Sequence, residues 1–201
     1  MYSVIVFDLG NVLIPFDYSI VVKHFNELKQ GMGDRFAQMY QENYYVHREF
    51  ESGKMTREKF LSIMMDWTEN VVTGEEFSKI YSSVFTLNQN VIDLLPELKK
   101  NYTLCLLSNT NDIHEEYGYS HHEFLKNFDK LFLSHRVGSI KPEKEIYKAV
   151  EAYTQKPSSE HLFIDDISEY VEGAKNCGWD AIKFTGYDDL VKELSKRGIV
   201  S

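Results

Sequence analysis

Cysteine is scarce in this sequence, with two in 201 residues, so a disulfide framework is excluded. Cys105 and Cys177 each lie in an apolar context, which favours reduced thiols and a cytoplasmic protein. No apolar run approaches the roughly 20 residues that a membrane span needs. The N-terminus carries no basic segment and Asp8 interrupts the first apolar run, so we expect neither a signal peptide nor a membrane segment.

Basic residues are also in the minority. The chain has 22 lysines and arginines against 31 aspartates and glutamates, with a formal net charge of −9 and no basic cluster. This balance argues against a nucleic acid or an anionic membrane as the partner. Hydrophobic residues at 43% and aromatics at 14% indicate a folded protein. A bound anion would therefore need a few placed groups or a metal ion.

Short apolar runs recur along the chain and are typical of buried parallel strands. They lie at residues 4–7, 103–107, 131–133, 162–164 and 181–184. Helical patterns separate most of these runs. Strands that alternate with helices predict an α/β fold, a doubly wound (Rossmann-like) parallel sheet.

Almost a hundred residues without a strand pattern separate the first run from the second. Four amphipathic patterns predict helices there, at residues 19–29, 34–43, 56–67 and 73–84. Thr73 and Glu76 fit a capping box, and a further helix is expected at residues 91–100 with a kink at Pro96. We therefore predict a helical-bundle cap of residues 15–88, inserted in a core of residues 1–14 and 89–201.

Ligands of parallel α/β sheets gather beyond the carboxyl ends of the strands. Polar residues follow four of the predicted strands, in chain order Asp8, then Ser108 and Asn109, then Lys141, then Asp165 and Asp166. Each of these is an ordinary loop residue when taken alone. Together they would bring three carboxylates, a hydroxyl, an amide and an ammonium to one edge of the sheet.

Carboxylates held this close repel one another, so they need a cation. Oxygen ligands of this kind suit Mg²⁺, which prefers few carboxylates together with water and a phosphate oxygen. Lys141 would neutralise a phosphate and hold a nucleophilic carboxylate ionised, while Ser108 and Asn109 would donate hydrogen bonds to phosphate oxygens. The set therefore predicts a phosphoryl-transfer site with Mg²⁺ as its cofactor.

These residues resemble, in order, the four motifs of the haloacid dehalogenase superfamily: Asp8 in the first, Ser108 in the second, Lys141 in the third, and Asp165 with Asp166 in the fourth. The resemblance covers nearly the whole chain and includes a helical cap after the first strand. Residues 8–12, 107–111 and 141–143, and the cap segment 51–60, are most similar to the glucose-1-phosphate phosphatase branch.

The resemblance implies a phosphatase in which Asp8 becomes an aspartyl-phosphate that water then hydrolyses. It implies that Mg²⁺ is held by Asp8, by the main-chain carbonyl of Gly10 and by Asp166, with Asp165 acting through water. The substrate would be a small phosphoester, such as a hexose 1-phosphate. We expect a monomer or a weak homodimer.

The sequence departs from the family pattern at Gly10, where most family phosphatases carry a second Asp that protonates the leaving group. General acid–base catalysis is worth roughly 10²–10⁴-fold in rate, so the loss matters. Either His47 or Arg48 of the cap binds the substrate and assists, or the leaving hydroxyl is acidic, as an anomeric one is, or turnover is slow. The acidic leaving group agrees with the branch resemblance and is preferred.

Other interpretations stay open. A 2-haloacid dehalogenase shares the nucleophile but needs no metal, and the pair Asp165 and Asp166 argues against it. A receiver-type signalling domain uses similar residues in another order and needs no cap. A pseudoenzyme that binds a sugar phosphate without turnover is supported by Gly10 alone. The histidines at 114, 121 and 122 match no zinc pattern and are expected on a solvated loop or helix face.

Overall fold

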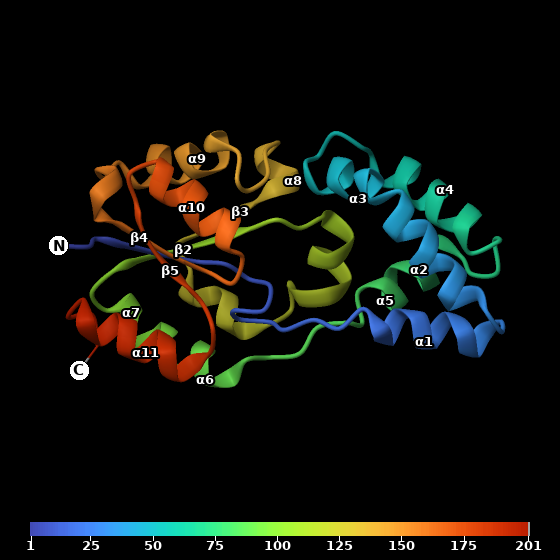
Figure 1. The fold of residues 1–201 in the computed structure, drawn as a ribbon, viewed down its shortest axis with the longest axis horizontal. Helices are drawn as coiled ribbons and strands as arrows, with labels where there is room; N and C mark the ends of the chain where they lie inside the picture. The colour runs from blue at the N-terminus through green and yellow to red at the C-terminus, as the bar shows by residue number, and fades with distance from the viewer. Residues whose placement is uncertain (201) are drawn as a thin grey trace.

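The computed structural model describes residues 1–200 and contains a five-stranded parallel sheet with helices on both faces (Figure 1). The sheet has the order β3-β2-β1-β4-β5, formed by β1 (Val4–Phe7), β2 (Thr103–Ser108), β3 (Lys130–Leu133), β4 (His161–Asp165) and β5 (Asp180–Lys183). All five strands lie at the predicted apolar runs. Because β1 is central, with β2 and β4 on its two sides, a crevice opens at its carboxyl end. The predicted α/β fold with a helical insertion after the first strand is confirmed.

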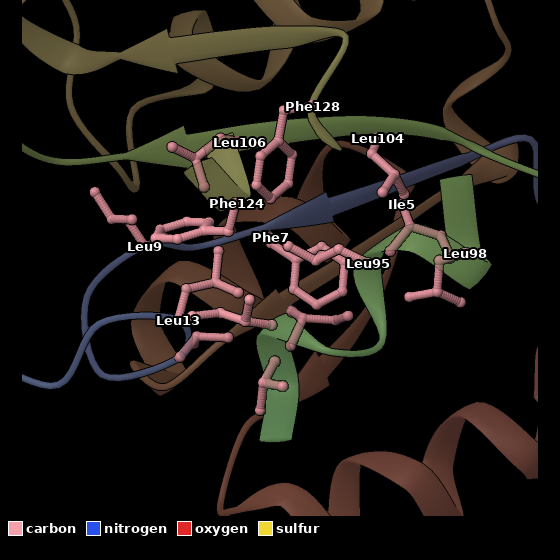
Figure 2. Close-up of a cluster of buried hydrophobic side chains, with 14 of the residues drawn as sticks. Ile5, Phe7, Leu9, Leu13, Leu95, Leu98, Leu104, Leu106, Phe124 and Phe128 are labelled. Atoms are coloured by element: carbon pink, nitrogen blue, oxygen red, sulfur yellow. The ribbon is translucent and has the colours of Figure 1, made fainter. Parts of the chain in front are cut away.

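The two faces of the sheet bury different side chains, since successive residues of a strand point to opposite sides. Ile5 and Phe7 point into the cluster shown in Figure 2, which is closed by α6 (Gln89–Ile92), α7 (Leu95–Lys99), the 3-10 helix η2 (Glu123–Asn127) and α11 (Tyr187–Lys196). Val4 and Val6 point to the other face, which α9 (Lys144–Thr154) and α10 (Ser168–Asn176) cover. Burial on both faces explains why the strands are nearly continuous apolar runs.

The insertion after β1 builds a layer of helices beyond the carboxyl edge of the sheet (Figure 1). Its apolar cluster is separate from the two clusters of the sheet, and its helices are α1 (Ser19–Leu28), α2 (Met32–Glu42), α3 (Tyr44–Glu51), α4 (Arg57–Trp67) and α5 (Gly74–Tyr81). Four of the five lie at the predicted patterns, and the Thr73–Glu76 capping box is present. The patterns did not predict α3. The cap boundaries 15–88 stay a prediction.

The segment after the cap differs from its expected form. In place of one kinked helix over residues 91–100, the chain forms the short helices α6 and α7. Pro96 lies in the first turn of α7, where its missing N–H costs no hydrogen bond, so it begins a helix rather than kinking one.

The cap rests on the core at two places. Arg57 of α4 lies 2.7 Å from a carboxylate oxygen of Asp112 and 2.7 Å from one of Glu116, beside the π-helix η1 (His114–Tyr119). Gly53, in the turn after α3, packs against His135 of α8 (Ser134–Val137) so closely that an added Cβ would lie 2.5 Å from the His135 carbonyl oxygen. The turn η3 (Ser158–Glu160) completes the core. Within residues 1–200, none of the helices has the length and apolar character that crossing a membrane requires.

We expect Gly53→Ala to destabilise the protein more than Gly138→Ala. Both glycines have a positive φ, 70° and 79°, where a side chain costs about 1–2 kcal/mol. Only at Gly53 does the added Cβ also meet a backbone carbonyl, whereas at Gly138 it meets nothing within 4 Å. Overpacking of this kind adds about 1–3 kcal/mol. Urea unfolding of the two variants measures the difference, and equal losses would contradict the tight contact between cap and core.

Candidate active site

The polar residues at the strand ends lie together beneath the cap. Most of them line a cavity of about 300 Å³ between the carboxyl edge of the sheet and helices α2 and α3. The core supplies a charged floor, which includes Asp8, Lys141 and Asp166. The cap supplies a largely aromatic wall, which includes Tyr40 and Tyr44. The cavity therefore has two chemically different ends.

Lys141 is the buried centre of the floor, with 1% of its surface exposed. Its ammonium group donates to Asp8 Oδ1 at 2.7 Å and to Asp165 Oδ2 at 2.6 Å. The ring centres of Phe163 and Tyr170 lie 5.4 Å and 5.0 Å from Nζ. Burial opposes the charge on Lys141, but Asp165 and Asp8 outweigh burial and raise its pKa above the usual value. Lys141 is therefore a permanent cation of the site.

Carboxylates outnumber this cation. Asp8, Asp165 and Asp166 each place an oxygen within 4.8 Å of the others. Burial raises the pKa of Asp8 to about 8, because the attraction of Lys141 is outweighed by burial together with repulsion from Asp165 and Asp166. The cluster thus carries a surplus of negative charge, which either a proton or a metal cation can neutralise.

The donor set of the cluster fits Mg²⁺, which takes oxygen ligands and keeps several waters. Both oxygens of Asp165 are engaged, by Lys141 and by the backbone N–H of Ile167 at 2.7 Å, which agrees with a contact through water. Within residues 1–200, Asp166 accepts a single hydrogen bond, from the Asn11 amide at 3.0 Å. The Gly10 carbonyl accepts from the backbone N–H of Val12 at 2.7 Å and keeps a second lone pair. Asp8, Asp166 and the Gly10 carbonyl are therefore the oxygens that would hold the ion.

Ser108 and Asn109 differ in how far their side chains are engaged. The Asn109 side chain accepts from the Lys141 N–H at 2.7 Å and donates to the Lys141 carbonyl at 3.1 Å and to the Tyr170 hydroxyl at 3.2 Å. It therefore fixes the loop that carries Lys141. The Ser108 hydroxyl makes only a 3.4 Å contact with the Asn109 carbonyl, so it can turn to donate to a phosphate oxygen.

Helix α3 brings a buried carboxylate, Glu51, to the cap side of the cavity. Glu51 is 7% exposed and its Oε1 lies 3.1 Å from His47 Nε2. The other ring nitrogen of His47, Nδ1, lies 3.0 Å from the Tyr81 hydroxyl. Both nitrogens of His47 therefore have partners within the cap, which favours a role in orienting Glu51.

Arg48 links the cap to the core through long contacts. Its Nη1 lies 3.5 Å from the Tyr170 hydroxyl and its Nη2 lies 3.5 Å from the Lys141 carbonyl. Neither contact is short, and the side chain is 28% exposed, so the guanidinium can move to meet a bound anion.

His114 is buried, so its expected place on a solvated face is wrong. It is 4% exposed, lies 3.1 Å from the Tyr18 hydroxyl and stacks on the Tyr81 ring at 4.2 Å. Burial lowers its pKa well below the usual value. The π-helix η1 turns this side chain under the cap, whereas His121 is exposed and His122 partly exposed, as expected.

Residues 5–198 match the family described as haloacid dehalogenase-like hydrolases. The chain belongs to this family. A D-ribitol-5-phosphate phosphatase of Bacteroides thetaiotaomicron is 29% identical over 97% of this chain and 98% of its own length. A haloacid dehalogenase family enzyme of the same bacterium, solved with magnesium and inorganic phosphate, has a TM-score of 0.80 at 26% identity over 94% of this chain and 99% of that one. A related hydrolase of Porphyromonas gingivalis, 24% identical over 98% of each chain, shares the fold at a TM-score of 0.80.

In this haloacid dehalogenase-like hydrolase, every predicted site residue lies in the cavity wall or, for Asp165, directly behind it. Their individual roles stay predictions. The sequence patterns missed Glu51, Tyr170 and Tyr18, which also line the cavity. A signal existed for Glu51, because it lies four residues after His47 and so on the same face of a helix.

We expect Mg²⁺ binding to release close to one proton at pH 7. A metal-bound carboxylate must be ionised, whereas the raised pKa of Asp8, about 8, keeps that group largely protonated without metal. Affinity should therefore fall by about tenfold for each pH unit below 8 and level off above it. Calorimetric titration in buffers of different ionisation enthalpy counts the proton. Asp8→Asn is the control and should bind more weakly with little pH dependence; a wild-type titration without proton release at pH 7 would contradict the prediction.

Proposed function

We propose that this magnesium-dependent phosphatase hydrolyses the phosphate monoester of a small polyhydroxylated metabolite, a sugar or a sugar alcohol. The observation that carries the proposal is that Asp8, Lys141 and Asp166 lie on the floor of one capped cavity, with Asp165 directly behind it. Its volume of about 300 Å³ is at the small end of ligand pockets, which suits a metabolite of a few carbons. The similarity to a D-ribitol-5-phosphate phosphatase supports this substrate class.

Asp8 is the nucleophile of the proposed reaction. Lys141 holds its Oδ1, which leaves Oδ2 to attack the phosphorus and form an aspartyl-phosphate. The Ser108 hydroxyl and the Lys141 ammonium donate to the phosphate oxygens, and Arg48 can approach them from the cap. Mg²⁺ held by Asp8, Asp166 and the Gly10 carbonyl would supply positive charge to neutralise the phosphate. The leaving alkoxide takes a proton from water. A second water molecule then attacks the phosphorus of the aspartyl-phosphate, which releases inorganic phosphate and regenerates the Asp8 carboxylate.

The leaving group decides between two kinds of substrate. Gly10 has no side-chain acid, and a Cβ there would lie 3.0 Å from Phe16 Cε1. An anomeric hydroxyl leaves more easily than a primary alcohol, so Gly10 favours a hexose 1-phosphate, as the resemblance to the glucose-1-phosphate phosphatase branch does. The similarity to a D-ribitol-5-phosphate phosphatase favours the other kind, an ester in which the phosphate is on a terminal hydroxyl. A sugar-phosphate-binding pseudoenzyme is the alternative, and measured turnover would exclude it. The oligomeric state and the compartment of the protein stay predictions.

We expect phosphate release that requires Mg²⁺ and is abolished in Asp8→Asn. The assay pairs each 1-phosphate with the terminal phosphate of the same sugar or sugar alcohol, with and without chelator. Removal of the nucleophile should lower kcat by at least a thousandfold, about 4 kcal/mol in the barrier, while circular dichroism shows the same fold. Activity that persists in Asp8→Asn, or that chelator leaves unchanged, would contradict the mechanism.

Gly10→Asp should raise kcat on terminal phosphates more than on 1-phosphates. The new carboxyl group supplies the missing proton donor, whose effect is roughly 10²–10⁴-fold for a poor leaving group. The backbone at Gly10 does not have a positive φ, and the neighbouring Phe16 ring is 40% exposed and can shift by a few tenths of an ångström. Gly10→Asn is the matched control, with the same shape and no acid. Equal effects of the two substitutions would contradict the leaving-group explanation.

A further inference from the structure

One ionised side chain of the cavity has no part in the phosphate chemistry. Glu51 belongs to α3 and lines the cavity from the cap side. Burial opposes its ionisation, but attraction to His47 and Arg48 outweighs burial and lowers its pKa below the usual value. A buried carboxylate that stays ionised needs donors for both of its oxygens.

Only one oxygen of Glu51 has such a donor. Oε1 lies 3.1 Å from His47 Nε2. The nearest cationic atom to Oε2 is Arg48 Nη1 at 3.7 Å, beyond hydrogen-bond distance, and within residues 1–200 no other donor bonds it. Oε2 is not sealed in the protein interior either, because Glu51 lines the cavity. This oxygen therefore offers an acceptor position to a molecule in the cavity.

Phenolic side chains share the cavity with Glu51. Burial, together with the charge of Glu51, raises the pKa of Tyr18, Tyr40 and Tyr44, all of which line the cavity, so their hydroxyls stay neutral. Neutral phenols donate and accept hydrogen bonds, and their rings pack against the C–H faces of a polyol. A leaving group that carries hydroxyls fits this half of the cavity.

The charge of Glu51 also discriminates. A carboxylate accepts hydrogen bonds from a hydroxyl but repels a second anionic group placed beside it in a partly desolvated cavity. An ammonium group is disfavoured too, because Arg48 lies 3.7 Å from the same oxygen. The charge pattern thus selects neutral hydroxyl groups at this end.

We propose that Glu51 is a specificity-determining residue, which accepts a hydrogen bond from a hydroxyl of the leaving group and rejects phosphate esters that carry a second anionic group. The inference rests on the proposed function and names the substrate class more narrowly: neutral polyhydroxylated monophosphates. His47 is the positioning residue that holds Glu51, and Tyr81 holds His47.

A matched substrate pair tests the proposal. Ribitol 5-phosphate and 5-phosphoribonate differ at the far end of the chain, where one has a CH₂OH group and the other a carboxylate. The wild-type enzyme should prefer the alcohol in kcat/KM, and Glu51→Gln should lower that preference by roughly tenfold to a hundredfold, as expected for a hydrogen bond to a charged group. Glu49→Gln is the control, because Glu49 is exposed on the same helix; it should change neither the rate nor the preference.

The ratio of kcat/KM for the two compounds separates an effect on specificity from an effect on folding, since a poorly folded variant loses both activities alike. An unchanged ratio in Glu51→Gln would overturn the proposal. So would a wild-type preference for the acid, which would assign the carboxylate of the substrate to Arg48. If the wild type hydrolyses neither compound nor p-nitrophenyl phosphate, the proposed function fails. The affinities of Asp8→Asn for the two compounds, with and without Glu51→Gln, then test the proposal without turnover.

Discussion

The active site depends on one buried ammonium group held between two carboxylates. Lys141 could not stay charged at 1% exposure without Asp8 and Asp165, whose oxygens accept from its ammonium group, and its charge in turn offsets part of the burial cost of Asp8. The three residues come from three separate loops at the carboxyl edge of the sheet. Their mutual requirement therefore fixes the relative positions of those loops, and the Asn109 side chain ties the Lys141 loop to the end of β2 by hydrogen bonds to the Lys141 backbone.

The balance between carboxylates and cations also makes the two ends of the cavity electrostatically different. Carboxylates exceed cations at the floor, so a divalent ion held there would balance the charge and would supply a positive centre for a phosphate. At the cap end, Glu51 is compensated by groups on its own helix, His47 and Arg48, with one oxygen left toward the cavity. The two ends of the cavity therefore differ in their electrostatic environment, so the proposed substrate would have one productive orientation.

Sequence patterns predicted the sheet and the floor of the site because both depend on residues that are neighbours in the sequence. A strand end fixes where Asp8, Ser108 or Asp165 must lie, whatever the rest of the chain does. The cap wall could not be predicted in this way. Helix α3 is short and follows α2 after Asn43, with no side-chain cap at its start, so no local signal marked it as a separate helix. The spacing of Glu51 from His47 was a local signal, but the burial of His114 against Tyr81 and Tyr18 arises from the packing of cap on core, which no local pattern encodes.

Gly10 connects the two ends of the cavity. Its missing side chain removes the acid that would serve a poor leaving group, and the Phe16 ring lies where a Cβ would point. Phe16 is also part of the cavity wall, beside Tyr18 of the same segment. The position that lacks the acid, Gly10, is therefore also the position against which the aromatic wall packs. Such a site gains more from binding and orienting a hydroxylated leaving group than from protonating it, since orientation alone can lower a barrier by several kcal/mol.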